Sequence, residues 1–367
     1  MLERLPYKPG DPSIRELRSQ RNVLTSNPDN TALAAEVAIT YINRGRATGD
    51  PRYYGYAQAA LEPWWDTGNA PAGILVLRAD IKQASHDFNG ALTDLGSAIE
   101  KEPDNINAIL TRAIILQVQG RYKAARRDCA RLLEAARRAP SIQLTATTCA
   151  ASVASFNGHA ARSWRILRDA LKRSVGAGTQ GMDWALTTLA DIAARLGRVH
   201  AAKRYFQAAL AMDESAWLSA AHADFLLQQG RPQQVIELLG GEPGADTLLL
   251  LLTLAEQKVD APRLDEHITL LRDRFAASRQ RGDQRHLREE ARFTLHLLDQ
   301  PKAALRLARA NWQTQREPED ARIFLQAALA AGRPKAARPV LGFLNRSGLE
   351  DKRLERLSEH ARMAIAQ

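Results

Sequence analysis

The chain contains only two cysteines, Cys129 and Cys149, among its 367 residues. Two cysteines are too few for a disulfide framework, and their spacing is not that of a zinc site. Two alternatives remain for them. They are buried thiols that take the place of small core residues, or they form a bridge in an oxidising compartment.

Long hydrophobic runs are also absent. The longest aliphatic stretch, Leu248–Leu252, is far shorter than the roughly 20 residues that cross a bilayer, so we expect no transmembrane helix. The first residues, Met1–Pro6, show no export signal, although a protein whose signal had been removed would begin in the same way.

Residue types that carry catalysis are present, but not in patterns that build a site. The eight histidines are scattered without paired metal-ligand spacing, and no phosphate-binding loop or nucleophile motif occurs. Residues 176–181 have the glycine spacing of a dinucleotide-binding loop, but we expect a helix before them and not the strand that such a loop requires. We therefore predict no catalytic residue, metal or cofactor, and interpret 176–181 as a flexible inter-repeat loop.

What the sequence does contain is a repeat of about 34 residues. Ala79 and Ala91 recur 34 positions later as Ala113 and Ala125. Small side chains allow two helices to approach closely, and such helix pairs bury their apolar faces only by stacking on neighbouring pairs. Turn signals with glycine mark further pairs at residues 120–122, 157–159, 196–198, 229–231 and 331–333, and turns without glycine are expected at 259–262 and 299–301.

These repeats predict an all-α chain, a solenoid of about nine helix pairs. We divide it into an N-terminal arm with a short helix (residues 1–30), the solenoid (31–348) and a C-terminal capping helix (349–367). Polar residues in the last helix suit it to cover an open end of the stack. Hydrophobic residues make up 45% of the chain, which is enough for a continuous core.

The register resembles that of the tetratricopeptide repeat over roughly residues 31–348. In that family, small residues occupy positions 8, 20 and 27 of the pattern and a proline lies near position 32. Ala79, Ala91, Ala98 and Pro103 match these positions, and other copies match in part. The resemblance implies a right-handed α–α superhelix that acts as a non-enzymatic scaffold and binds a peptide or protein partner.

The opening of the chain, as far as residues 53–61, is similar to bacterial repeat proteins that carry a secretion signal. This resemblance implies a periplasmic location, with a cytoplasmic location as the alternative.

In the tetratricopeptide family, the first helix of each pair lines a concave face. The residues that fall at the lining positions of this chain are mostly polar, acidic or aromatic, and none of them is lysine. They form the predicted partner-binding groove: Asp80, Gln83, Asn107, Thr111, Gln117, Thr148, Ser152, Trp184, Thr187, Asp191, Trp217 and Asp224. The alternative is a solvent-facing stripe that binds nothing and simply tolerates threonine, glutamine and aspartate.

Aspartate recurs at one lining position in three repeats, as Asp80, Asp191 and Asp224. Because carboxylates attract cations and repel acidic chains, we expect a basic or polar extended peptide as the partner. Trp184 and Trp217, at equivalent positions of adjacent repeats, would supply flat apolar anchors. The alternative is that both tryptophans pack between helices.

Arginines crowd the expected second helices, and the net charge of +10 therefore resides mainly on the outer wall. This wall predicts an alternative function, docking to nucleic acid or to an anionic membrane. The other interpretation, which we favour, is a solvated outer face that contacts neither nucleic acid nor an acidic membrane, because no aromatic side chains interleave with the arginines and many arginines have an acidic neighbour. The arginines of the two richest helices are Arg121, Arg126, Arg127, Arg131, Arg137 and Arg138, then Arg162, Arg165, Arg168 and Arg173.

Overall fold

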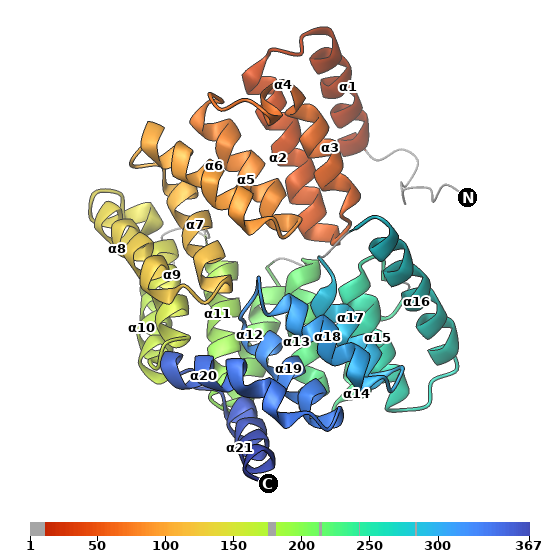
Figure 1. The fold of residues 1–367 in the computed structure, drawn as a ribbon. Coiled ribbons are helices and arrows are strands. Elements are labelled where there is room, and N and C mark those ends of the chain that lie inside the picture. The colour runs from red at the N-terminus through yellow and green to blue at the C-terminus, as the bar shows by residue number, and fades with distance from the viewer. Residues whose placement is uncertain (1–11, 175–180, 213–214, 242, 283–284) are drawn as a thin grey trace. The chain divides into compact units, whose positions relative to one another are not determined.

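The computed structural model describes residues 12–174, 181–212, 215–241, 243–282 and 285–367, and every regular element in these ranges is a helix (Figure 1). The predicted all-α solenoid is confirmed. Residue contacts group the chain into two compact units, Met1–Asn105 and Ile106–Gln367. The division predicted from the repeats, into an arm (1–30), a solenoid (31–348) and a capping helix (349–367), stays a prediction. The predicted loop 176–181 lies, except for Gly181, outside the described residues.

The described part of the first unit holds a single helix, then two helix pairs with a short helix, α4, between them. Helix α2 pairs with α3 and packs on α5, and α5 pairs with α6. Asn30 begins α2, and its side chain accepts a hydrogen bond from the N–H of Leu33 at 3.1 Å. The helices of this unit are α1 (Pro12–Ser26), α2 (Thr31–Thr48), α3 (Arg52–Ala60), α4 (Glu62–Trp65), α5 (Ala72–Ala84) and α6 (Phe88–Lys101).

The second unit continues the same plan over a longer stretch. Its odd-numbered helices from α7 to α19 contact one another in sequence, and each also packs against the even-numbered helix that follows it. The first members of the pairs are α7 (Ile106–Val118), α9 (Gln143–Ser155), α11 (Met182–Arg195), α13 (Ala216–Gln228), α15 (Asp246–Gln257), α17 (Leu287–His296) and α19 (Pro318–Ala330). The second members are α8 (Tyr122–Arg138), α10 (Ala160–Ser174), α12 (Val199–Leu210), α14 (Pro232–Leu239), α16 (Leu264–Gln280), α18 (Pro301–Asn311) and α20 (Arg338–Ser347), and α21 (Lys352–Ala366) closes the chain.

The small residues of the repeat lie where helices touch. Ala79, Ala91, Ala98 and Ala125 have no exposed surface. A larger side chain at these positions would hold the two helices of a pair apart, because protein interiors are close-packed and tolerate little added volume.

The turns follow the predicted pattern. The five glycines of the predicted glycine turns all have positive φ, a conformation that glycine adopts without steric cost. In the two predicted turns without glycine, Asp260 and Asp299 both have φ of 50°. Aspartate tolerates this left-handed region better than most residues do, so these degenerate repeats keep the same hairpin geometry.

The C-terminal part of the second unit returns to its beginning. The N–H of Arg316 donates a hydrogen bond to the carbonyl of Val118 at 2.8 Å, and the rings of Tyr122 and Phe343 lie 5.9 Å apart. Further along, the N–H of Ala160 donates to the Glu350 carboxylate at 2.5 Å. The inner face of the second unit is therefore partly covered by its own chain.

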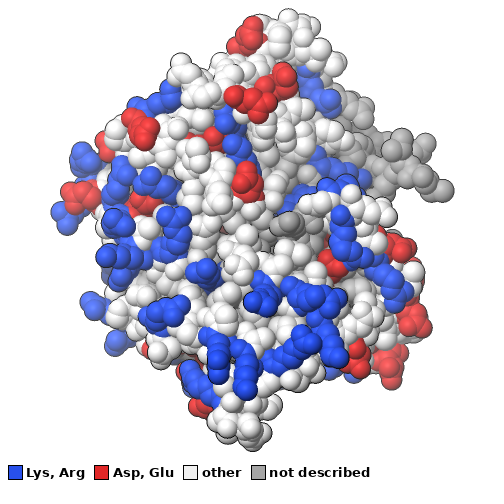
Figure 2. Space-filling view, in the orientation of Figure 1, with Lys and Arg blue, Asp and Glu red and all other residues white. Residues whose placement is uncertain are grey.

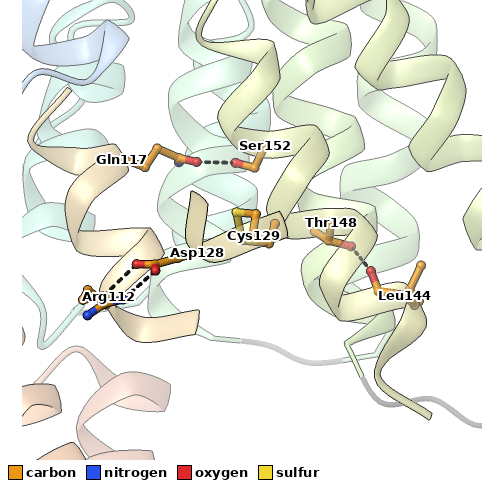
Figure 3. The surroundings of a disulfide bond; sticks show 8 residues. Arg112, Gln117, Asp128, Cys129, Leu144, Thr148 and Ser152 are labelled. Atoms are coloured by element: carbon orange, nitrogen blue, oxygen red, sulfur yellow. Dashed lines mark hydrogen bonds and ion pairs between the residues drawn. A yellow bond between two sulfur atoms is a disulfide. The ribbon is translucent and has the colours of Figure 1, made fainter. Parts of the chain in front are cut away.

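A disulfide joins Cys129 of α8 to Cys149 of α9 (Figure 3), so the bridge, and not the pair of free thiols, is the alternative that the structure contains. The two Cα atoms are 5.5 Å apart, within the usual range for a disulfide, and both side chains are buried. Beside it, Arg112 of α7 and Asp128 of α8 form an ion pair at 2.6 Å. Covalent and ionic links therefore hold three consecutive helices together.

Replacing both cysteines by alanine should lower the free energy of unfolding by about 3 kcal/mol, because the bridge closes a loop between residues 20 apart and so restricts the unfolded chain. Denaturant unfolding of the two proteins without reductant measures the difference. A reductant should destabilise the unsubstituted protein and leave the double-alanine variant unchanged. Equal stability of the two oxidised proteins would contradict the prediction.

Candidate functional site

The predicted groove residues all lie on first helices of the pairs, as expected from the register, but in both units. Asp80 and Gln83 belong to α5 of the first unit, and the other ten lie on α7, α9, α11 and α13 of the second. Asp80 is not a free carboxylate, because Arg46 of α2 lies 3.0 Å from it. Burial nonetheless raises the pKa of Asp80 above its ordinary value, against the opposing effect of Arg46.

Several of the predicted polar residues satisfy their hydrogen bonds within the chain. The hydroxyls of Thr148 and Thr187 donate to backbone carbonyls one turn earlier, both at 2.8 Å. The Ser152 hydroxyl donates to the side-chain carbonyl of Gln117 at 2.9 Å, and this bond links α9 to α7 (Figure 3). Thr148, Ser152 and Thr187 are buried. These residues hold neighbouring repeats together, and their polar groups are already partnered.

Asp224 is engaged by later helices of the same unit. Its carboxylate lies 2.6 Å from the guanidinium of Arg292 on α17 and 2.8 Å from that of Arg322 on α19. Burial acts to raise the pKa of Asp224, but the two arginines together hold it well below the ordinary value. The Gln228 side chain donates to the same carboxylate and accepts from Arg353 of α21. Helices α17, α19 and α21 thus meet α13 through this one cluster.

A second buried cluster, centred on Arg195 of α11, was missed by sequence reasoning. Arg195 has no exposed surface, and its guanidinium donates to the Ser155 hydroxyl at 2.7 Å and to the Ser155 carbonyl at 3.1 Å. It also pairs with Asp191 at 2.9 Å and lies 4.5 Å from the ring centre of Phe156. The repeat register could have pointed to Arg195, since it occupies the last lining position of its repeat. Only the packing shows that it points into the core.

The tryptophans differ from the rest of the set. Trp217, in the first turn of α13, is 62% exposed, whereas Trp184, in the first turn of α11, is half-buried. The carboxylate side chain of Asp191, two turns after Trp184 on α11, keeps 41% of its surface exposed although it pairs with Arg195. Trp184, Asp191 and Trp217 form what we call the tryptophan edge. Asn107 and Thr111, on α7, are exposed and half-buried respectively.

A buried histidine, His222, follows Trp217 by five residues on α13. The His222 ring stacks on Phe206 with 5.2 Å between ring centres, and neither of its nitrogens finds a hydrogen-bond partner among the described residues. Burial, and to a smaller extent the nearby Lys203 ammonium, lowers the pKa of His222 to about 4. His222 is therefore neutral in the folded protein at pH 7.

The pKa of His222 predicts a loss of stability in mild acid. The unfolded imidazole, with an ordinary pKa near 6.5, binds a proton between about pH 6.5 and pH 4 while the folded one does not. Lowering the pH from 7 to 5 should therefore cost about 2 kcal/mol through this residue. In His222→Phe that part of the pH dependence should disappear in denaturant titrations. An unchanged slope in the variant would show that other groups cause the acid sensitivity.

Groups of three or more metal-binding side chains close enough to hold an ion do not occur within the described ranges. Of the helices in those same ranges, none combines the length and the apolar character that a membrane crossing needs.

The fold also occurs in a solved structure without close sequence similarity. One crystal structure, of the APC/C hetero-tetramer Cut9-Hcn1, matches 94% of this chain and 66% of its own with a TM-score of 0.50 and 15% identity. Another, of a tetratricopeptide repeat protein from Parabacteroides merdae, matches 66% of this chain and 91% of its own with a TM-score of 0.45 and 17% identity. No protein-family model matches the sequence, and no curated protein does. The chain has a tetratricopeptide-type fold.

Proposed function

We propose that this protein is a non-enzymatic scaffold that binds a protein or peptide partner along the first helices of its repeats. The observation that carries the proposal is the exposure of Trp217, which is 62% accessible at the start of an otherwise well-packed helix. Tryptophan is among the residues most enriched at the energetic centres of protein interfaces, because it buries a large rigid surface at little entropic cost.

The tryptophan edge favours a partner segment that is apolar and basic. Trp217 and Trp184 offer ring surface, and the half-exposed Asp191 adds a carboxylate on the same helix as Trp184. A lysine or arginine of the partner would be attracted to both the carboxylate and the aromatic faces. Asn107 and Thr111 extend the proposed contact toward α7. We assign Asp224 a structural part and not a partner contact, because Arg292 and Arg322 already neutralise it.

The disulfide supports the periplasm, or another oxidising compartment, as the place where the protein works. Bridges of this kind persist outside the reducing cytosol. The resemblance of the opening residues to exported repeat proteins points the same way.

Selection of peptides from a displayed random library on the oxidised protein tests the proposed site. We expect selected peptides to combine aromatic or aliphatic residues with lysine or arginine, and to bind Trp217→Ala at least about tenfold more weakly. Met363→Ala is the matched control, because Met363 is 60% exposed on α21, away from the edge in sequence. Equal binding of the selected peptides to the unsubstituted protein and to Trp217→Ala would refute the tryptophan edge as the site.

A further inference from the structure

The outer side of the second unit carries a dense basic surface. Helices α8 and α10 expose Arg126, Arg127, Arg138, Arg162, Arg165 and Arg173, and we call these six residues the basic wall. Figure 2 shows Lys and Arg side chains gathered at the edge of the molecule where Figure 1 places α8 to α10. On the next outer helix, α12, Lys203 and Arg204 are also exposed.

The acidic residues of these helices do not neutralise the basic wall. Asp128 is buried and pairs with Arg112 of α7 at 2.6 Å. Glu134 pairs with Arg137 at 3.0 Å, and Asp169 pairs with Arg168 at 2.9 Å. Both carboxylates therefore form their ion pairs with arginines that are not among the six residues of the wall. Among the described residues, no acidic side chain forms an ion pair with the six arginines of the wall. The basic wall therefore has a positive electrostatic potential, which attracts polyanions.

Two exposed aliphatic side chains accompany the charges. Ile166, next to Arg165 on α10, is 46% exposed, and Val199, the first residue of α12, is 37% exposed. In a bilayer, such side chains enter the boundary between headgroups and acyl chains while arginines remain among the phosphates. A nucleic acid offers exposed aliphatic side chains no comparable apolar layer, and its single strands are bound through aromatic platforms. No aromatic residue of α8, α10 or α12 is among the large hydrophobic side chains exposed in the described part of the chain.

The disulfide adds an independent argument, because Cys129 lies on α8, the helix that carries half of the wall. A protein that keeps this bridge works in an oxidising compartment. There, the phosphate headgroups of anionic lipids are a polyanion that is present on every bounding membrane.

We propose that the basic wall docks this protein on the surface of an anionic lipid bilayer, with arginines on the lipid phosphates and Ile166 and Val199 in the headgroup boundary. This inference does not depend on the tryptophan edge, which lies on first helices of the pairs. Each arginine near such a surface contributes modestly, and several together give reversible binding that weakens with salt.

Co-sedimentation of the full oxidised chain with vesicles tests the proposal. The protein should bind vesicles that contain phosphatidylglycerol, should bind pure phosphatidylcholine vesicles far more weakly, and should be released by added salt. Arg126→Glu/Arg127→Glu/Arg165→Glu should reduce binding to the anionic vesicles at least about tenfold. The matched control reverses three exposed basic residues of α16 and α18, Arg272, Lys302 and Arg309, and should bind within about twofold of the unsubstituted protein.

Further variants separate the possible outcomes. Should the triple glutamate variant fail to fold, the corresponding triple glutamine variant replaces it. Ile166→Ser, which leaves all charges in place, should reduce vesicle binding severalfold and leave retention on heparin unchanged. The proposal is wrong if the triple variant binds anionic vesicles like the control. It is also wrong if duplex DNA is bound more tightly than anionic vesicles at the same salt concentration and Ile166→Ser has no effect on either.

Discussion

Asp224→Ala should lower the free energy of unfolding of the second unit by about 4 kcal/mol. The substitution leaves the guanidinium groups of Arg292 and Arg322 facing each other without the carboxylate that lies 2.6 and 2.8 Å from them. Both arginines are then deprived of their partner in a poorly hydrated place, and their mutual repulsion is no longer offset. Because α17 and α19 meet α13 through this cluster, the loss should appear as a lowered midpoint in denaturant unfolding.

The pH dependence gives a second view of the same cluster. Since the pKa of Asp224 is depressed in the folded protein, its contribution is fully present above the ordinary aspartate pKa near 3.8 and is lost as the pH falls below it. Asp273→Ala removes an exposed aspartate of α16 and is the matched control, with an expected change within about 0.5 kcal/mol. A similar small change for Asp224→Ala would mean that the arginines find other partners.

Arg195→Ala should cost about 4 kcal/mol as well, for a different reason. The side chain is wholly buried, so its removal leaves a cavity beside Phe156 and deprives the Ser155 carbonyl and hydroxyl of their donor. Asp191, which is half-exposed, can return to water and adds little to the loss.

Arg195→Lys is informative beside the alanine variant. Lysine keeps the charge, but it lacks the planar guanidinium group through which arginine donates hydrogen bonds to Ser155 and Asp191 at the same time. We therefore expect Arg195→Lys to retain at most half of the stability that Arg195→Ala loses. Arg204→Ala, at an exposed site on the neighbouring helix α12, should be nearly neutral. A fully stable Arg195→Ala would show that the hydrogen bonds to Ser155 contribute nothing net.

The helix pairs and their turns could be predicted because they depend on local chemistry. The small side chains of Ala79 and Ala91 predicted that two helices approach closely at these positions, and both residues are fully buried. The turn glycines, such as Gly197, were expected to adopt positive φ, and the structure confirms it: φ of Gly197 is 71°. Such signals repeat every 34 residues or so, and each is read from a few neighbouring positions.

The candidate site was predictable only in part. The repeat register correctly put Trp217 on the first turn of the first helix of a pair, and Asp224 two turns later. It assigned both to the lining of one groove and could not distinguish the exposed residue from the covered one, because exposure depends on which distant segments pack at the same place. Trp217 keeps most of its surface, whereas Asp224 is covered by Arg292 and Arg322, which lie far along the chain.

The sequence by itself determined that this protein is a stack of helix pairs with a basic outer side, since period and charge are properties of residues close together in the chain. Only the tertiary structure decided that the C-terminal part of the chain folds back to contact α7, α8, α10 and α13, and that Cys129 and Cys149 bond to each other. Both results are contacts between segments whose pairing no local pattern encodes. The ion pair of Arg322 with Asp224, for example, joins residues 98 apart in the chain and is strengthened by the low dielectric of the packed interior.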